Sequence, residues 1–323
     1  MMAGPKPTPT PAGDALPDAP RGNWVDRAAP ASWKPYLKLA RFDRPIGAWL
    51  LLFPCWWSQV LAEHALGRTY PNVWYLALFY IGAFVMRGAG CTYNDIVDRD
   101  YDASVARTAG RPIPSGQVTL RHAQLFLILL CLIGLAVLVQ FNFFTVVLGA
   151  ASLLLIAVYP FTKRFTYWPQ VMLGLTFKWG ALVGWAAING SLALAPLVLY
   201  AGSVLWTIGY DTIYAHQDKE DDLMVGLKST ALRFGDQTQR WLVGFYGGAL
   251  VLWGYAGLLA GAQTGYFLAL ALAAAQLAWQ VTSLDTSDPA NCLARFKSNQ
   301  LVGWALFLGV VADMARKGLA GAF

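Results

Sequence analysis

Charged residues are scarce in this sequence of 323 residues. Only 13% of them are Asp, Glu, Lys or Arg, whereas 57% are hydrophobic. A soluble globular domain usually carries about 25% charged and about 45–50% apolar residues. This composition leaves too little polar surface for a water-soluble particle, so it predicts a protein that crosses a membrane several times. In such a protein the net charge of +6 reports the orientation of the chain and does not indicate a nucleic-acid partner.

Cysteine and histidine are rare as well. The four cysteines include no CxxC pair, and none of the three histidines has a His or Cys partner at ligand spacing. These absences exclude a disulfide framework and argue against a zinc site. The sequence also lacks the GxxxxGKS/T phosphate loop, the GxGxxG dinucleotide motif and the GxSxG nucleophile motif.

The first 33 residues differ in composition from the remainder. They are rich in Pro, Ala and Gly and lack apolar periodicity, which predicts a disordered tail over 1–33. They contain no hydrophobic core of a secretory signal, and Asp14, Asp18 and Asp26 argue against a mitochondrial transit peptide. Residues 34–323 are predicted to form one transmembrane domain.

Apolar runs of nearly membrane-spanning length follow the tail. Each is close to the ~20 residues that a bilayer requires of a helix, and their length argues against the shorter, alternating segments of a β-barrel. The sequence therefore predicts an all-α fold with about nine transmembrane helices. The predicted spans are 45–62, 72–93, 122–140, 143–160, 168–187, 194–213, 240–260, 264–283 and 299–315.

Basic residues indicate how these spans are oriented. If the N-terminus lies inside, most of the 24 Lys and Arg residues fall in inside loops, as the positive-inside rule requires. We therefore expect a multi-pass protein of a bacterial inner membrane with its N-terminus and polar loops in the cytoplasm. The mitochondrial inner membrane is the alternative.

Half of the 18 acidic residues gather in two clusters, Asn94–Asp102 and Asp211–Asp222, at the inside ends of two spans. If the helices continue, Asn94, Asp98 and Asp102 share one face, with Asp95 beside them. The acids of the second cluster recur at i, i+7 and i+11 (Asp211, Asp218 and Asp222). Carboxylates stacked in this way repel one another unless a cation binds, and oxygen-only sets suit Mg²⁺. The alternative is an acid-rich loop at the headgroup boundary.

Basic residues accompany both clusters. Arg107 and Arg111 follow the first, and Lys228 follows the second. Arg87 lies seven residues before Asn94, on the same helical face and deeper in the membrane, where a guanidinium needs an anion or a cavity. Lys178 lies inside the fifth span, where structural pairing and function are equally open.

These residues resemble a known family. The first cluster matches the NDxxDxxxD motif, and Asp218 with Asp222 matches the DxxxD motif, of the UbiA superfamily of intramembrane aromatic prenyltransferases. The resemblance covers about 34–315 and is closest to the branch that prenylates 4-hydroxybenzoate in ubiquinone biosynthesis. Lys178 departs from the pattern, so its role cannot be carried over. The further matching segments are Arg44–Gly47, Arg111–Gly116, Tyr159–Arg164, Tyr210–Asp222 and Gly226–Thr230.

The resemblance implies a UbiA-type helical fold around a central cavity that opens to lipid. It also implies Mg²⁺-dependent transfer of a polyprenyl group from polyprenyl diphosphate to the ring carbon ortho to the hydroxyl of 4-hydroxybenzoate. The partners would be these two substrates and the lipid bilayer.

Roles for individual residues follow from the resemblance as expectations. Asp95, Asp98, Asp218 and Asp222 are the expected catalytic residues. The expected metal ligands are Asn94, Asp95, Asp98, Asp102, Asp211, Asp218 and Asp222. Diphosphate would contact Arg87, Arg107, Arg111 and Lys228. The aromatic acceptor would contact Arg44, Arg164 and Tyr214.

Two other functions remain open at this point. One is a prenyltransferase of the same superfamily with another acceptor, such as homogentisate, a naphthoate or haem. The other is a cation-coupled transporter that uses the acidic clusters as an ion path. The acids lie at the ends of the spans, and the spans lack paired helices broken at mid-membrane, which argues against the transporter.

Overall fold

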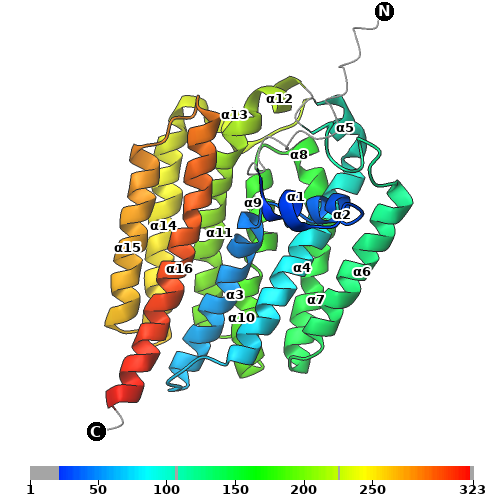
Figure 1. Ribbon diagram of the computed structural model, residues 1–323. Helices are drawn as coiled ribbons and strands as arrows, with labels where there is room; N and C mark the ends of the chain where they lie inside the picture. Colours follow the sequence, from blue (N-terminus) through cyan, green and yellow to red (C-terminus); the bar gives the residue numbers. More distant parts are fainter. Residues whose placement is uncertain (1–21, 106–107, 225, 321–323) are drawn as a thin grey trace, which may run out of the picture. The chain divides into compact units, whose positions relative to one another are not determined.

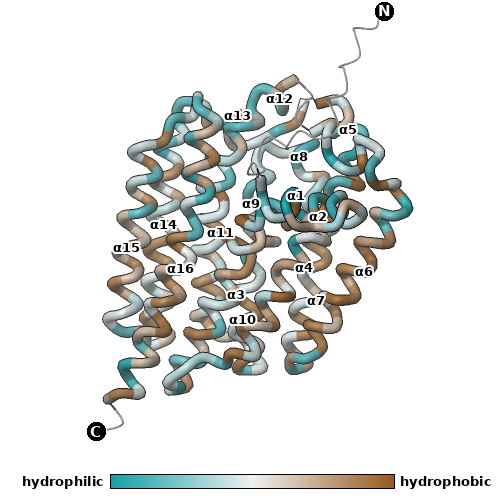
Figure 2. The backbone as a smooth tube through the Cα atoms, viewed as in Figure 1, coloured by the Kyte–Doolittle hydropathy of each residue, from teal (hydrophilic) through white to brown (hydrophobic). Residues whose placement is uncertain are grey.

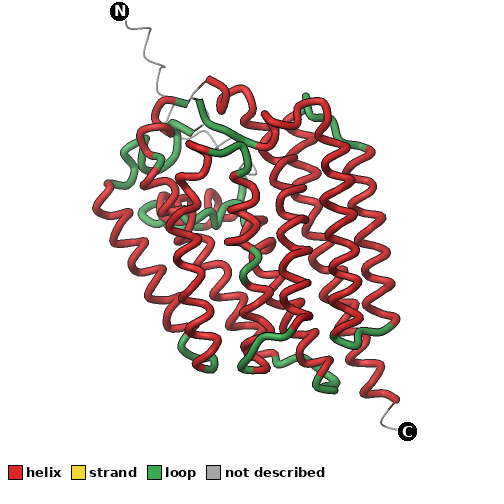
Figure 3. Tube along the Cα trace, turned by 180° about the vertical axis from the view of Figure 1, so that it is seen from behind, coloured by secondary structure: helices red, strands yellow, loops and turns green. Residues whose placement is uncertain are grey.

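A computed structural model describes residues 22–105, 108–224 and 226–320. The chain divides into two compact units. Unit 1 contains the described residues up to Gly47 together with Phe84–Gly134, and unit 2 contains Ala48–Ala83 and the chain from Leu135 onward. The described residues form helices and connecting loops without a strand (Figure 3), which confirms the predicted all-α class.

Unit 1 is built around the second half of a long helix, α4 (Val73–Val97), and most of α6 (Leu120–Leu138) (Figure 1). It also holds the short helices α1 (Trp24–Ala28), α2 (Lys34–Leu39) and α5 (Arg99–Ser104). The Leu39 side chain packs in a buried cluster with Val118 and Ala123.

The structure adds detail to the predicted tail. Residues 1–21 lie outside the described residues, so their disorder stays a prediction. Residues 22–33, which the sequence assigned to the same tail, contain α1. The Asn23 side chain accepts a hydrogen bond from the Asp26 amide at the start of this helix, as a typical N-cap does, and Val25 is fully buried. The folded part of the chain therefore begins earlier than predicted.

Unit 2 is a bundle around α11 (Leu194–Ala215), which contacts α9, α10, α14 and α16. Three buried indoles, those of Trp57, Trp206 and Trp253, pack against one another beside this helix. The other helices of the unit, with α3 beginning at the end of unit 1, are α3 (Ile46–Ala65), α7 (Phe143–Val158), η1 (Tyr159–Phe161), α8 (Thr162–Phe165), α9 (Pro169–Phe177), α10 (Gly180–Asn189), η2 (His216–Asp218), α12 (Lys219–Met224), α13 (Thr230–Phe234), η3 (Gly235–Gln237), α14 (Thr238–Leu259), α15 (Thr264–Thr282) and α16 (Pro289–Ala320).

Every predicted span coincides with a long helix, except that 168–187 is divided between α9 and α10. Among the described residues, 6 helical segments are long and apolar enough to cross a membrane, so membrane insertion is supported without fixing the number of crossings at nine. These segments are Val73–Val97, Leu120–Leu138, Phe143–Phe165, Pro169–Asn189, Thr230–Leu259 and Thr264–Thr282.

Large apolar side chains cover the outer faces of several helices. In α6, Leu125, Leu129 and Leu132 are exposed, and Figure 2 shows this helix mostly in the colour of hydrophobic residues. Such extended apolar faces are unfavourable in water. They are the surfaces expected to contact lipid.

A single carboxylate fixes the start of α15. Asp313, on α16, is 1% exposed and accepts hydrogen bonds from the backbone amides of Gln263, Gly265 and Tyr266 at 2.7–3.0 Å. The first amides of a helix have no partner within the helix. Asp313 therefore caps α15 from a neighbouring helix and joins the two.

We expect the substitution Asp313→Ala to lower the free energy of unfolding by about 2–4 kcal/mol, because it leaves buried amides without an acceptor. Denaturant unfolding in detergent measures this loss. The matched control is Asp236→Ala in η3, where the side chain is exposed and the expected change is within about 0.5 kcal/mol. Equal stability of the two variants would contradict the capping role.

Candidate active site

The first acidic motif lies in unit 1, at the end of α4 and the start of α5. The backbone continues helically through it, because the amide of Asp98 donates to the carbonyl of Asn94 and the amide of Asp102 to that of Asp98, each at 2.8 Å. The Asn94 side chain also donates to the Asp98 carboxylate at 3.2 Å. The predicted pairing of these two side chains one helical turn apart is therefore present in the structure.

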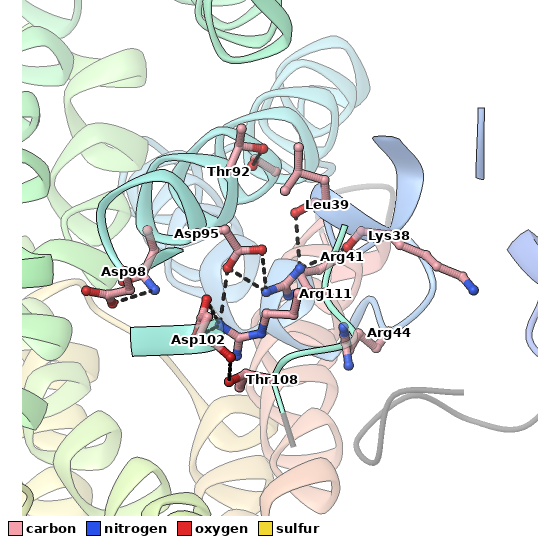
Figure 4. A network of polar contacts seen from close by, with 12 residues as sticks. Lys38, Leu39, Arg41, Arg44, Thr92, Asp95, Asp98, Asp102, Thr108 and Arg111 are labelled. Carbon is pink, nitrogen blue, oxygen red and sulfur yellow. Dashed lines mark hydrogen bonds and ion pairs between the residues drawn. The ribbon is translucent and has the colours of Figure 1, made fainter. Parts of the chain in front are cut away.

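Asp95 points into a cluster of arginines (Figure 4). Its carboxylate is 1% exposed and accepts two hydrogen bonds from Arg41, at 2.8 and 2.9 Å. Arg111 adds a third contact at 3.3 Å. Both Arg41 bonds come from Nη2, and such charge-assisted hydrogen bonds are stronger than neutral ones. Asp95 thus holds together a segment before α3, the end of α4 and the loop after α5.

Asp102 completes this network. Both of its carboxylate oxygens accept from Arg111 Nη1, at 2.9 and 2.8 Å, and Thr108 donates to its backbone carbonyl at 2.8 Å. Burial raises the pKa of Asp102 to about 6, against the opposing effect of Arg111, because a low dielectric disfavours the charged form. Arg111 therefore bridges two carboxylates of the motif.

Two carboxylates of the motif, those of Asp95 and Asp102, have arginine partners within unit 1. The sequence spacing predicted that Asn94, Asp95, Asp98 and Asp102 would all bind a metal, but arginines engage the carboxylates of Asp95 and Asp102. Among the described residues there is no group of three or more His, Cys, Asp or Glu side chains placed to hold a metal. Asn94 and Asp98 are half-buried oxygen donors one turn apart, and this donor chemistry fits Mg²⁺.

Arg87 lies on α4, seven residues before Asn94, and its side chain lies close to Gly47, at the start of α3. A Cβ atom at position 47 would stand 2.6 Å from Arg87 Nε, so only glycine leaves room for the guanidinium there. Gly47, in the Arg44–Gly47 segment that resembles the UbiA superfamily, therefore leaves space for the Arg87 side chain. Arg44, predicted to contact the acceptor, is itself buried with its Nε 3.6 Å from a carboxylate oxygen of Asp43.

The second acidic motif lies in unit 2. Asp211 and Tyr214 belong to the last turns of α11, and the Tyr214 ring lies 4.6 Å from that of Phe296. The helix then tightens into η2 before α12 begins. The backbone from Asp211 to Asp222 is therefore not one continuous α-helix, because a 3₁₀ turn separates α11 from α12. The shared face of Asp211, Asp218 and Asp222 stays a prediction.

Other members of the second motif are positioned as follows. Asp222 is buried on α12, whereas the side chain of Asp218 lies outside the described part of the structure. His216 contacts the Thr238 hydroxyl at 3.0 Å, and burial lowers its pKa to about 4. The imidazole is therefore neutral at pH 7.

Two basic residues of unit 2, Lys228 and Arg164, lie at η1, α8 and the loop that follows α8. The amide of Lys228 donates to the carbonyl of Lys163 at 3.0 Å, while its Nζ lies 3.4 Å from the carbonyl of Phe165 and 5.3 Å from the ring of Tyr167. Arg164 is exposed, with its guanidinium 5.2 Å from the ring of Phe161. Arg107, predicted to bind diphosphate, lies outside the described residues.

Sequence reasoning missed Arg41. It precedes the predicted spans and contributed only to the count of inside charges. In the structure it has a positive φ of 61°, donates to the carbonyls of Lys38 and Leu39 at the end of α2 and pairs with Asp95. No local pattern in the sequence encodes a pairing across 54 positions.

Comparison with known proteins adds an independent observation. The model of the UbiA prenyltransferase family matches residues 51–308. The chain is 50% identical over 290 residues to the mitochondrial 4-hydroxybenzoate polyprenyltransferase of Arabidopsis thaliana, covering 90% of this chain and 71% of that protein. It is 47% identical over 310 residues to the human mitochondrial protein of the same name, covering 93% and 83%.

Solved structures share the fold. A UbiA homolog from Aeropyrum pernix, at 25% identity, superposes with a TM-score of 0.68 and covers 82% of this chain and 98% of its own. A UbiA homolog from Archaeoglobus fulgidus, bound to GPP and Mg²⁺, is 19% identical with a TM-score of 0.62, covering 86% and 99%.

These relatives correct the expected location. The prediction of a bacterial inner membrane is wrong, because the similar proteins are named mitochondrial. The bias of Lys and Arg marks the inner side of a membrane and does not distinguish cytoplasm from matrix. Asp26, which had argued against a transit peptide, pairs with Lys38 at 2.8 Å within unit 1.

The motifs, the helical architecture and these similarities agree with one another. The family model covers most of the chain, and relatives near 50% identity cover about nine-tenths of it. The chain therefore belongs to the UbiA prenyltransferase family.

Proposed function

We propose that this chain is a 4-hydroxybenzoate polyprenyltransferase of ubiquinone biosynthesis. The observation that carries the proposal is the end of α4, where one part of the acidic motif offers oxygen donors for a cation and the other part holds arginines in place. The names of the relatives support the acceptor. Neither another aromatic acceptor nor cation transport has a comparable observation in its favour.

Divalent metal binding is assigned by donor chemistry. We assign Mg²⁺ to Asn94 and Asp98 in the first motif, and to Asp211, Asp218 and Asp222 in the second. When bound, Mg²⁺ supplies positive charge to the oxygens of the departing diphosphate. The Archaeoglobus fulgidus homolog is bound to GPP and Mg²⁺, which supports a divalent metal in this family.

The arginine network has a different task in this proposal. Asp95 and Asp102 neutralise and orient Arg41 and Arg111, so that a guanidinium is already in place when the anionic diphosphate arrives. Charges that are fixed before reaction stabilise the transition state without reorganisation. Arg87 is assigned to the same anion, with Arg107 and Lys228 assigned from the sequence alone.

The reaction needs few other protein groups. The allylic C–O bond of the polyprenyl diphosphate breaks, the ring carbon ortho to the hydroxyl of 4-hydroxybenzoate forms the new C–C bond, and the ring then loses its proton. Apolar surroundings exclude water, which would otherwise capture the allylic cation. Arg44, Arg164 and Tyr214 are the proposed contacts of the acceptor.

Membranes that contain the expressed chain test this function. With Mg²⁺, labelled 4-hydroxybenzoate and polyprenyl diphosphates of different lengths, we expect a labelled lipid product and released diphosphate, and we expect EDTA to abolish both. Product formed from homogentisate, a naphthoate or haem in place of 4-hydroxybenzoate would contradict the acceptor. Cation flux in proteoliposomes without any prenylated product would favour a transporter.

A further inference from the structure

Lys178 is fully buried, with 0% of its surface exposed, inside the segment Pro169–Asn189, which is long and apolar enough to cross a membrane. It occupies the junction between α9 and α10. Its amide donates to the carbonyl of Gly174, and its own carbonyl accepts from the amide of Ala181. Polar side chains at this depth need a partner. Because the side chain has no exposed surface, it is suited to support other residues and not to contact a substrate directly.

Lys178 binds a backbone carbonyl of α3 that a proline leaves without its usual donor. Pro54 lies inside α3 and has no amide hydrogen to donate to the carbonyl four residues earlier, that of Leu50. A proline in a membrane helix leaves one carbonyl without a hydrogen-bond donor, and it is tolerated when a neighbouring group donates to that carbonyl instead. Lys178 Nζ donates to the Leu50 carbonyl oxygen at 2.6 Å, so the lysine supplies the missing donor.

The same amine also faces α11. Its Nζ lies 4.5 Å from the ring centroid of Trp206 and 5.2 Å from that of Tyr210. Trp206 is held in turn, because its indole donates to the Asn299 side chain at 2.7 Å. A side chain on the α9–α10 junction therefore connects α3 with the aromatic face of α11.

That face leads directly to the second acidic motif. Tyr210 precedes Asp211, and Tyr214 lies one turn further along α11. The Phe296 ring on α16 contacts both tyrosines, at 5.7 Å and 4.6 Å. A rotation or shift of α11 at Trp206 and Tyr210 would move the residues at its end with it.

We propose that Lys178 is a positioning residue. Its amine binds the Leu50 carbonyl, which Pro54 leaves without a helical donor, and at the same time packs against Trp206 and Tyr210. These contacts fix the end of α11 that carries Asp211 and Tyr214. The significance of that end rests on the proposed function. The contact itself does not depend on the function.

Four proteins test the proposal: the wild type, Lys178→Met, Pro54→Ala and the double variant. Lys178→Met keeps the length of the side chain and removes the donor, so we expect a melting temperature lower by about 5 °C. We also expect less thermal stabilisation by Mg²⁺ with geranyl diphosphate, and kcat/KM lower by roughly tenfold or more, because small displacements of a site are costly.

In the double variant, the Pro54→Ala substitution restores a backbone amide that can donate to the Leu50 carbonyl. We therefore expect the double variant to melt at a higher temperature than Lys178→Met and to recover part of the ligand-induced shift. Lys317→Met, at the exposed end of α16, is the control and should match the wild type.

Three results would overturn the proposal. The first is a double variant that melts no higher than Lys178→Met. The second is a Lys178→Met variant that melts lower but keeps wild-type ligand stabilisation and kinetics, since this would make the lysine purely structural. The third is a Lys178→Met variant identical to the wild type. If the wild type fails to prenylate 4-hydroxybenzoate, the proposed function fails, while the melting and ligand-shift comparisons still decide the role of Lys178.

Discussion

Replacement of Asp98 by alanine is expected to lower the rate of Mg²⁺-dependent prenyl transfer by about 100-fold or more, while the protein stays folded and membrane-inserted. The Asp98 carboxylate belongs to the half-buried pair with Asn94, so its loss removes a charged oxygen donor from the proposed cation site. Loss of a single preorganised electrostatic group commonly costs about 10²–10³ in rate. Turnover of labelled 4-hydroxybenzoate in membranes, measured over a range of Mg²⁺ concentrations, gives the rate and the metal requirement together.

A nearby aspartate provides the control for Asp98. Asp100 lies two residues further on, on α5, with its side chain 84% exposed beside Arg99. Asp100→Ala removes the same charge from the same helical region, and we expect it to retain wild-type turnover and Mg²⁺ dependence. Wild-type turnover by Asp98→Ala, or equal losses in both variants, would contradict a specific role of Asp98 in cation binding.

The second large effect is expected at Arg41. Arg41→Ala removes the guanidinium whose Nη2 donates to both oxygens of a carboxylate that is 1% exposed. Because breaking a buried pair leaves an incompletely compensated charge in a low dielectric, we expect the free energy of unfolding to fall by about 3–5 kcal/mol. Denaturant unfolding in detergent provides the measurement. Lys38→Ala, which breaks the more exposed pair with Asp26, should cost less than about 1 kcal/mol.

Two further variants separate the ion pair from the backbone strain at Arg41. Its φ of 61° is unfavourable for a residue with a Cβ by about 1–2 kcal/mol, so Arg41→Gly should be less destabilising than Arg41→Ala although both lack the guanidinium. The double variant Arg41→Ala with Asp95→Asn should cost less than the sum of the single variants, since the two side chains interact. Additive losses would show that the pair with Asp95 contributes little.

The fold class was largely predictable from the sequence because it depends on local composition. Apolar runs of membrane-spanning length mark helices wherever they occur, and the observed helices coincide with them closely. The departures are local as well. The fifth predicted span divides at Lys178, and α11 passes into a 3₁₀ turn at His216. A hydropathy pattern does not record such changes, because they leave the composition of the run unchanged.

The candidate site was predictable only in part. Sequence spacing was sufficient to predict that Asn94 and Asp98 lie together, since residues four apart on a helix are neighbours whatever surrounds them. The same spacing assigned Asp95 and Asp102 to a metal, whereas the structure pairs them with Arg41 and Arg111. The helix phase was right for both predictions.

The sequence by itself determined that this chain is a helical membrane protein with two acidic motifs, and that it resembles one family of prenyltransferases. Only the tertiary structure decided which carboxylates face arginine, why glycine stands at position 47 and what satisfies Lys178. The physical reason is distance along the chain. Arg41 and Asp95 are 54 residues apart and Lys178 and Leu50 are 128 residues apart, so these partners meet only through the packing of whole helices.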